Sequence, residues 1–337
     1  MIHFWRRIVS SRNSFRDGLQ LSVVIATHNR PDQLDRALDS LKRQSLASDC
    51  FELIVVNNGS SDPTDAMVKK HLEQRPHWNL VGEAKPGAAA ARNTGIRLSR
   101  APLVLFLDDD IVADRELVAQ HVQSHRERPE VAVLGAVRFP WKGDETPLFA
   151  CLHRHPELFQ SFAFPDAENV PFQYFYTCNL SMARSFFSQG PGFDERFTTS
   201  GFEDTELGYR FVNAGYHIVF NEKASALHDV RTTYRQFSQK RYASGRWARY
   251  FIGQYPEVRS TFLGPSSWKS RISSLIGFSA GPLTPLFDLG ITPMKRVLQG
   301  VLGVLCWHRL QYLFRKGYST DSPDLRAPCF EEQYSVK

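Results

Sequence analysis

The chain has 337 residues and a formal net charge of +6; 42% of the residues are hydrophobic and 23% are charged. This is an ordinary globular composition, long enough for one large or two modest domains. Five scattered cysteines without metal-type spacing exclude a disulfide framework and a zinc site as the basis of the fold, so we expect a reducing compartment.

Positive charge is concentrated in the last third of the chain. Residues 231–316 hold 14 Lys and Arg against 2 Asp and Glu, whereas residues 19–230 hold 21 against 28. A block of this kind is typical of a solvated face, but it also suits an anionic membrane surface, a polyanionic substrate or nucleic acid. We expect a basic N-terminal segment, 1–18, a main domain, 19–230, and a basic helical extension, 231–337.

Neither a secretory signal nor a membrane-spanning helix is expected. The first fifteen residues carry Arg6, Arg7 and Arg12 but no long apolar stretch, and the uncharged run 273–287 is interrupted by Pro282 and Pro285. We therefore expect a cytoplasmic protein, and a peripheral contact with the inner membrane face stays open.

Strands and helices alternate in the first part of the chain. Four apolar runs predict strands, and a helical pattern follows each of the first three: strands at 21–26, 51–56, 78–84 and 101–107, with helices between them. This alternation predicts parallel crossovers and a doubly wound α/β sheet.

Beyond residue 112 the alternation lapses. In order, we expect a strand at 131–139, a loop-rich stretch to about residue 170, a strand leading to a helix at 172–184, a helix bearing Leu207 and Phe211, a strand at 217–221, and basic helices at 234–256 and 294–316. The last helix mixes apolar residues with Lys and Arg, so it suits a membrane interface and packing on the body equally well.

Polar loops follow three of the predicted strands: 27–30, 57–62 and 108–110. Because the carboxyl ends of parallel strands meet at one edge of a sheet, and ligands of such sheets bind there, we expect the three loops to converge on a ligand site.

Three neighbouring aspartates form the last of these loops. In an extended chain Asp108 and Asp110 point to one side and Asp109 to the other. Two carboxylates aimed at one point repel each other unless a cation lies between them, and Mg²⁺ or Mn²⁺ prefers such oxygen ligands. The run predicts a divalent metal site; the alternative is a turn whose aspartates cap the next helix.

Five motifs in order resemble the inverting family 2 glycosyltransferases of the GT-A fold: LSVVIATHNR, LIVVNNGSSD, ARNTGI, LVLFLDDD and GFDERFTTSGFEDTEL. The resemblance covers roughly residues 20–230. It implies a mostly parallel sheet with a nucleotide-binding part, 19–135, joined to an acceptor-binding part, 136–230. It also implies transfer of a sugar from a nucleoside diphosphate sugar to an acceptor, with inversion at the anomeric carbon.

The same resemblance implies which residues contact the donor: Thr27, Asn29, Arg30, Arg92, Asn93 and Asp108. Arg92 would bind the diphosphate, because a guanidinium matches phosphate oxygens bidentately. Asn57 stands where an aspartate often reads the base. Its amide offers both donors and an acceptor, so we expect a UDP-sugar while GDP- and dTDP-sugars stay admissible.

For catalysis, the resemblance implies Asp108, Asp110 and His228 as ligands of Mn²⁺ or Mg²⁺, which would offset charge on the departing diphosphate. The Glu203-Asp204 pair matches the catalytic dipeptide, with Asp204 taking the proton from the acceptor and Glu203 shaping the acceptor side. Near a helix start, the macrodipole would keep Asp204 ionised. The implied acceptor is lipid-linked or a saccharide.

The leading hypothesis is therefore a metal-dependent inverting glycosyltransferase of glycolipid or cell-surface polysaccharide synthesis. The alternative is a catalytically silent sugar-nucleotide-binding or scaffolding protein of the same fold. A nucleotidyltransferase would carry a Gly-rich signature with Lys or Arg near the N-terminus, which is missing. No nucleic-acid partner is expected, because the basic third shows no helix-turn-helix, RRM or zinc-finger pattern.

Overall fold

The computed structural model describes residues 18–73, 75–140, 146–155, 164–188, 190–199, 201–263, 268–288 and 296–320. The chain divides into two compact units. Unit 1 comprises Met1–Pro140, Phe162–Arg196 and Glu203–Val230, and unit 2 comprises Trp141–Ser161, Phe197–Phe202 and Arg231–Lys337.

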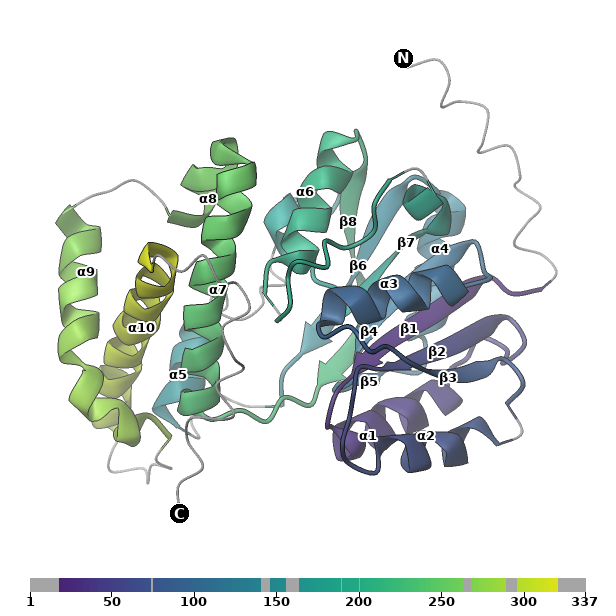
Figure 1. Ribbon diagram of the computed structural model, residues 1–337, viewed down its shortest axis with the longest axis horizontal. Coiled ribbons are helices and arrows are strands. Elements are labelled where there is room, and N and C mark those ends of the chain that lie inside the picture. The colour runs from purple at the N-terminus through teal and green to yellow at the C-terminus, as the bar shows by residue number, and fades with distance from the viewer. Residues whose placement is uncertain are drawn as a thin grey trace. The chain divides into compact units, whose positions relative to one another are not determined.

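In the described part of unit 1, eight strands form one sheet in the order β3-β2-β1-β4-β7-β6-β8-β5 (Figure 1). Their bounds are β1 (Leu21–Thr27), β2 (Phe51–Asn57), β3 (Trp78–Gly82), β4 (Leu103–Asp108), β5 (Ile111–Ala113), β6 (Val131–Arg138), β7 (Asn179–Ala183) and β8 (His217–His228). Strands β3, β2, β1 and β4 are parallel, as are β6 and β8, whereas β7 is antiparallel to β4 and β6, and β5 to β8. The predicted mostly parallel α/β sheet is confirmed.

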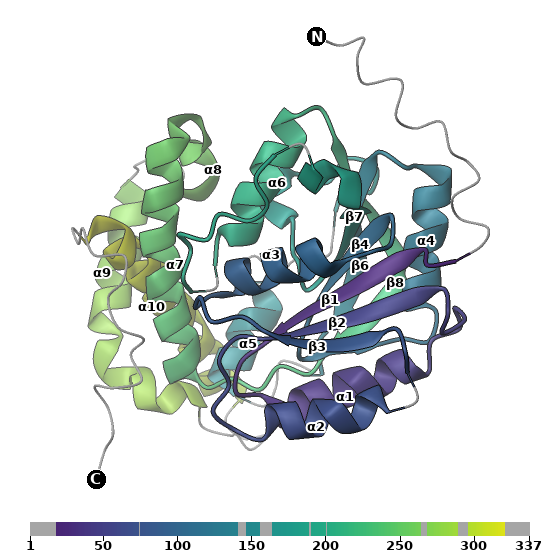
Figure 2. The same cartoon turned by 45° about the vertical axis from the view of Figure 1, so that its right-hand side comes forward.

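Helices cover both faces of this sheet, because its strands are apolar on both sides. Val23 and Ile25 of β1 pack with the helices α1 (Pro31–Lys42), α2 (Thr64–Leu72) and α4 (Leu117–Glu127). Val24, one residue away and therefore on the other face, packs with α3 (Ala88–Leu98), and α6 (Glu203–Asn213) shares that second core. Figure 2 shows α1 and α2 on one side of the sheet and α3 on the other.

The parallel register brings the three polar loops to one edge. Thr27, the last residue of β1, is paired with Asn57, the last residue of β2, and Ala26 is paired with Asp108 at the end of β4. The side chains that follow these strands therefore start from neighbouring positions at the carboxyl edge.

The elements after residue 112 differ from the expectation in several places. Neither β5 nor α4 was predicted, and the segment after β7 is the 3₁₀ helix η4 (Arg184–Ser188), not an α-helix. A further 3₁₀ turn, η3 (Phe172–Tyr174), precedes β7. Strand β8 continues well beyond residue 221, so its last residue is His228.

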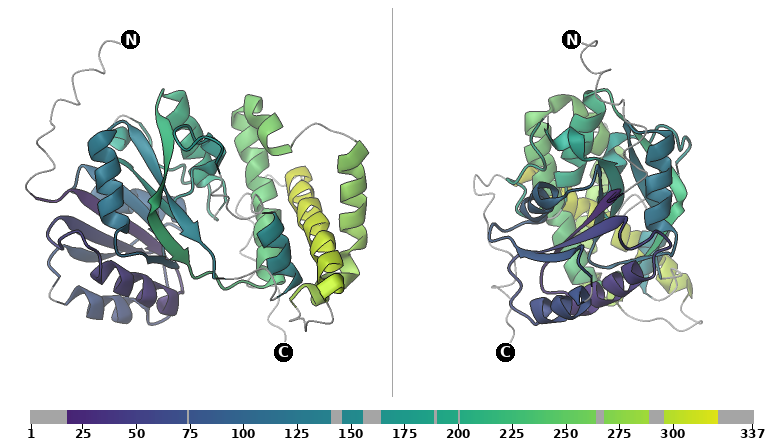
Figure 3. Two further views of the ribbon diagram at one scale, coloured as in Figure 1. Left: turned by 180° about the vertical axis from the view of Figure 1, so that it is seen from behind. Right: turned by 90° about the vertical axis from the view of Figure 1, so that its right-hand side faces the viewer.

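Unit 2 is helical in its described part. It contains α5 (Pro147–Arg154), α7 (Tyr234–Gln254), η5 (Pro256–Val258), α8 (Arg259–Leu263), α9 (Trp268–Ser279), η6 (Gly281–Asp288) and α10 (Arg296–Ser319). Helix α10 lies between α7 and α9 and also contacts α5 (Figure 3). The core between them includes Leu148, Cys151, Phe237, Phe287 and Leu310.

Helix α10 packs on the other helices of its own unit. Leu302, Cys306, Leu310 and Phe314 are buried there. A side chain at Gly245 of α7 would collide with the backbone of α10 at Phe314, so the two helices approach closely. Among the helices that the structure describes, none has both the length and the apolar character needed to cross a bilayer.

Candidate active site

Asp109 joins the loop after β1 to the loop after β4. The Thr27 hydroxyl donates to one Asp109 oxygen at 2.9 Å, and Arg30 Nη1 donates to the other at 3.0 Å. The same Arg30 nitrogen lies 3.0 Å from Asp110 Oδ2. Burial raises the pKa of Asp109 to about 6, although the Arg30 guanidinium acts in the opposite direction. No role was predicted for Asp109, which binds both Thr27 and Arg30 and so holds them together.

The loops after β1 and β2 are joined by asparagine side chains. Asn29 lies in the left-handed region with φ 53°, a conformation that asparagine tolerates well. Its Oδ1 accepts from the Ser61 amide at 2.8 Å. Asn57 accepts from the Ser60 amide at 2.9 Å and donates to Asp65 at 2.6 Å. Both side chains thus stabilise the loop around residues 57–62.

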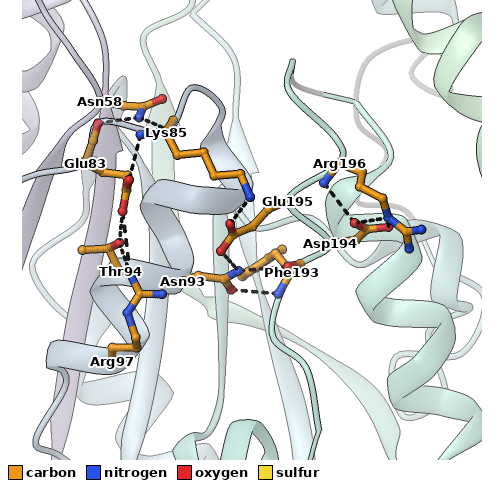
Figure 4. Close-up of polar contacts among 10 residues, drawn as sticks. All are labelled: Asn58, Glu83, Lys85, Asn93, Thr94, Arg97, Phe193, Asp194, Glu195 and Arg196. Carbon is orange, nitrogen blue, oxygen red and sulfur yellow. Dashed lines mark hydrogen bonds and ion pairs between the residues drawn. The ribbon is translucent and has the colours of Figure 1, made fainter. Parts of the chain in front are cut away.

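Asn58 connects this loop to the segment that enters α3. Its amide nitrogen donates to the carbonyl oxygens of Glu83 and Lys85 at 3.0 and 2.8 Å (Figure 4). Its Oδ1 accepts from the Gly87 amide at 2.8 Å. Gly87 has φ 115°, which favours glycine at this position. Asn58 was missed from the sequence, where Asn-Asn-Gly is also an ordinary turn pattern.

Asp108, Asp110 and His228 come together at the carboxyl edge. Each offers one ligand atom, and these atoms lie within 4.8 Å of one another. Strand pairing sets Ile111 opposite His228, and His228 Nε2 lies 2.9 Å from Asp110 Oδ1. Two carboxylate oxygens and one imidazole nitrogen are a donor set that suits Mn²⁺, and Mg²⁺ accepts the carboxylates. The three residues therefore fit a divalent ion.

Arg92 connects Asp108 with the start of α6. It is buried, with Nη2 3.0 Å from Asp108 Oδ1 and Nη1 2.9 Å from Glu203 Oε1. Burial works to lower the pKa of the guanidinium, but the carboxylates of Asp108 and Glu203 outweigh it, so the pKa lies above its ordinary value. Arg92 thus stays charged between two acids and holds Glu203 in place.

Replacing Arg92 should destabilise the protein strongly. Arg92→Met leaves the buried Glu203 carboxylate without its cation, and a change of this kind costs about 3–5 kcal/mol. Urea unfolding followed by circular dichroism measures the loss. Arg196→Met is the control. The Arg196 side chain is exposed, so its ion pair with Asp194 contributes only about 0–1 kcal/mol to stability. Adding Glu203→Gln to Arg92→Met should restore part of the stability; no recovery would contradict the buried-charge argument.

Asp204 lies in the first turn of α6 and is half-buried. Its Oδ1 accepts from the Thr205 amide at 2.8 Å. Burial, together with the neighbouring Glu203 carboxylate, raises the pKa of Asp204 to about 7, against the effect of Arg92. The helix dipole was expected to keep this carboxylate ionised, but burial outweighs it. A carboxylate with this pKa can both accept and release a proton near neutral pH.

Asn93 points away from this cluster. Its amide nitrogen donates to the Phe193 carbonyl at 2.9 Å and to Glu195 at 2.8 Å, and its Oδ1 accepts from the Phe193 amide at 2.8 Å (Figure 4). Lys85 binds the same Glu195 carboxylate at 2.6 Å. All three hydrogen bonds of the Asn93 side chain thus fix the segment 193–195 on α3, and none of the three is made with Asp108 or Arg92. The predicted contact of Asn93 with the donor stays a prediction.

The chain belongs to glycosyl transferase family 2, whose model matches residues 22–188. The N-terminal domain of galactosyltransferase matches residues 162–236. Together the two matches cover the strands and loops that carry the site, and the predicted family is confirmed.

Two curated relatives illustrate the sequence similarity. The validoxylamine A glucosyltransferase of Streptomyces hygroscopicus subsp. limoneus is 35% identical over 214 residues, and the match covers 56% of this chain and 47% of the relative. The hyaluronan synthase of Pasteurella multocida is 26% identical over 224 residues, 58% of this chain and 23% of the relative. The match to the first of these relatives spans about half of its length.

Two solved structures share the fold. The mannosyltransferase PcManGT from Pyrobaculum calidifontis, in complex with GDP-Man and Mn²⁺, superposes with a TM-score of 0.59 at 18% identity, covering 89% of each chain. S. aureus TarS 1-349, in complex with UDP, gives a TM-score of 0.50 at 13% identity, covering 91% of this chain and 95% of the other. At these identities the likeness shows the fold alone.

Proposed function

We propose that the protein is a metal-dependent inverting glycosyltransferase. It would move a sugar from a nucleoside diphosphate sugar to an acceptor hydroxyl in glycolipid or cell-surface polysaccharide synthesis. One observation carries the proposal: in a family 2 chain, the metal-type set Asp108, Asp110 and His228 is joined through Arg92 to the Glu203-Asp204 pair. A leaving-group site and a carboxylate base are thereby parts of one cluster.

In this proposal the donor nucleotide lies over the loops after β1 and β2. Thr27, Asn29 and Arg30 supply the first loop, and Asn57 fixes the second beside the base. A UDP-sugar is the donor we favour over GDP- and dTDP-sugars. TarS holds UDP and PcManGT holds GDP-Man in their structures, so the fold accommodates both bases.

Asp108, Asp110 and His228 would hold Mn²⁺ or Mg²⁺. When bound, a divalent ion offsets negative charge on a departing diphosphate as a Lewis acid. Arg30, which lies 3.0 Å from both Asp109 and Asp110, adds a positive charge on the same side. Arg92 adds a second one beside Asp108, where a guanidinium suits phosphate oxygens.

Asp204 is the base that we assign. Inversion by single displacement needs one carboxylate on the acceptor side, which takes the proton of the acceptor hydroxyl as its oxygen attacks the anomeric carbon. The Asp204 pKa of about 7 suits this transfer at neutral pH. Glu203, bound to Arg92, would orient the start of α6 and so the position of Asp204.

The location that we propose is the cytoplasm. Among the described residues, Cys151, Cys178 and Cys306 are buried free thiols, as is usual for proteins of a reducing compartment. A lipid-linked or saccharide acceptor would then meet the enzyme at the inner face of the membrane.

A thermal-shift panel tests the donor class. The protein is heated with UDP, GDP or dTDP, each with Mn²⁺, with Mg²⁺ or with EDTA. We expect one nucleotide to raise the melting temperature, and only with metal, because binding to the folded state alone stabilises it by mass action. Equal stabilisation with and without metal would contradict the proposal, and so would a melting temperature that no nucleotide raises. Release of the nucleoside diphosphate from the matching sugar nucleotide then separates an enzyme from a silent binding protein.

A further inference from the structure

Helix α9 packs on α10 through its small residues. Ser273, Gly277 and Ala280 are buried and recur every three or four positions, so they share one side of the helix. The Ser273 hydroxyl lies 2.9 Å from His308 Nδ1, and Arg309 donates to the Gly277 carbonyl at 3.3 Å. The side of α9 that faces its own unit is therefore small and partly polar.

Three large apolar residues of α9 lie on the outside instead. Ile272, Leu275 and Phe278 are 46%, 66% and 63% exposed. A single exposed apolar residue is common, but three on one helix whose buried side is Ser, Gly and Ala reverse the usual pattern of a helix in water. Such an arrangement is stable where an apolar medium covers the outer side.

Helix α10 carries two further exposed apolar residues. Val301 and Val304 are exposed, and they precede His308 by seven and four residues, so they lie on the side of α10 against which α9 packs. We call Ile272, Leu275, Phe278, Val301 and Val304 the outer apolar face of unit 2.

Charge identifies what covers this face. The two helices that carry this face, α9 and α10, hold six Lys and Arg and no Asp or Glu, and Arg271 is exposed next to Ile272. A second copy of the chain would bring an equally basic surface against it, and the two would repel each other. A nucleic acid would match the charge but would leave the leucine and phenylalanine side chains in water. A bilayer with anionic lipids matches both.

We propose that unit 2 binds the surface of an anionic lipid bilayer through the outer apolar face, with Leu275 and Phe278 entering the acyl boundary and the surrounding Lys and Arg contacting lipid headgroups. Membrane binding requires neither the metal nor the donor. It is therefore independent of the transfer reaction proposed above, and either can fail without the other.

Vesicle flotation with the full chain tests the proposal. The protein is mixed with vesicles of phosphatidylcholine alone and of equimolar phosphatidylcholine and phosphatidylglycerol. We expect binding to the mixed vesicles only, weakened by salt, and a loss of about tenfold or more in Leu275→Ser/Phe278→Ser. Leu98→Ser is the matched control, because Leu98 is an exposed leucine of unit 1. No flotation, or equal flotation of the double variant, would overturn the proposal.

A fluorescent reporter separates the other occupants. Leu275→Cys carries an environment-sensitive dye in a chain in which Cys50 and Cys329 are serine. We expect a blue shift on addition of mixed vesicles and none on addition of an RNA oligonucleotide. A shift that appears with rising protein concentration would assign the face to a second copy. A spectrum that is already blue in dilute protein would assign it to another segment of this chain. A shift with RNA would assign it to nucleic acid, and each of these three results would overturn the proposal.

Discussion

Asp204→Asn should abolish sugar transfer while nucleotide binding persists. Asparagine has nearly the shape of aspartate but cannot accept the proton of the acceptor, and a general base contributes about 10²–10⁴-fold to a rate. The rate of nucleoside diphosphate release with acceptor present measures transfer, and the thermal shift with nucleotide and metal measures binding. Equal loss of both would mean that Asp204 supports the fold rather than the reaction.

The control for this variant is Asp39→Asn, which makes the same chemical change at an exposed acid paired with Lys42. Asp39 lies on α1, and we expect the replacement to leave transfer unchanged. Asp204→Asn should also fold normally, because the Thr205 amide can still donate to the side-chain oxygen of asparagine.

The pH dependence of Asp204 follows from its raised pKa. Transfer needs the ionised form, so below the Asp204 pKa of about 7 the rate should fall about tenfold per pH unit. For stability the sign is opposite. A folded-state pKa above the ordinary 3.8 gives a stabilising contribution that is full below 3.8 and is lost as the pH rises through about 7. The stability of Asp204→Asn relative to that of the wild type should therefore be most favourable above pH 7. If the variant instead became less stable than the wild type as the pH rises above 7, the assignment would be contradicted.

Removal of one of the proposed metal ligands should have the second-largest effect. Asp110→Asn takes away a charged oxygen from the set with Asp108 and His228, and a Lewis-acid ion contributes several kcal/mol to a transition state. We expect transfer to fall about a hundredfold or more, with an accompanying rise in the Mn²⁺ concentration needed for half-maximal rate. Chelation of the wild type by EDTA should reproduce the loss, and added Mn²⁺ should reverse it.

Asp114→Asn is the control for the metal variant. Asp114 lies four residues further on and binds Arg138 and Ser225, outside the ligand set. Its replacement should leave the Mn²⁺ dependence unchanged. If Asp110→Asn and Asp114→Asn behave alike, or if EDTA has no effect, the ion is not part of the reaction.

The sheet and the convergence of three loops could be predicted because they depend on local order in the chain. Strands β1, β2 and β4 are mainly apolar with little alternation, and the polar residues at their ends reach the carboxyl edge once the strands are parallel. His228 could be placed only through the family resemblance, because the length of β8, which carries it to Asp110, is not visible in the sequence.

Helix α4 was missed because histidines replace apolar residues on its buried side. His121 and His125 are fully buried, where they bind Ser181 at 2.8 Å each, and His121 also binds Asn179. Burial lowers their pKa values to about 4 and about 3, so both are neutral and pack as core residues. A hydrophobic pattern cannot reveal a helix whose inner side is completed by such tertiary hydrogen bonds.

The direction of Asn93 could not be predicted either. Successive residues of a helix point about 100° apart, so Arg92 and Asn93 point in different directions. Only the fold shows that Arg92 faces Asp108 while Asn93 faces the segment 193–195. Likewise, the exposure of Leu275 and Phe278 depends on which side of α9 meets α10.

Unit 2 is assembled from three separate stretches of the chain, and this limits where the chain can be truncated. A product ending at Val230 would keep α5 but lack the helices that bury Leu148 and Cys151, and Phe197 would lose the ring of Trp247. Such a fragment would expose apolar side chains to chaperones and proteases and would not behave as a minimal enzyme. A fusion protein that carries unit 1 together with unit 2 therefore has to include all three stretches of unit 2.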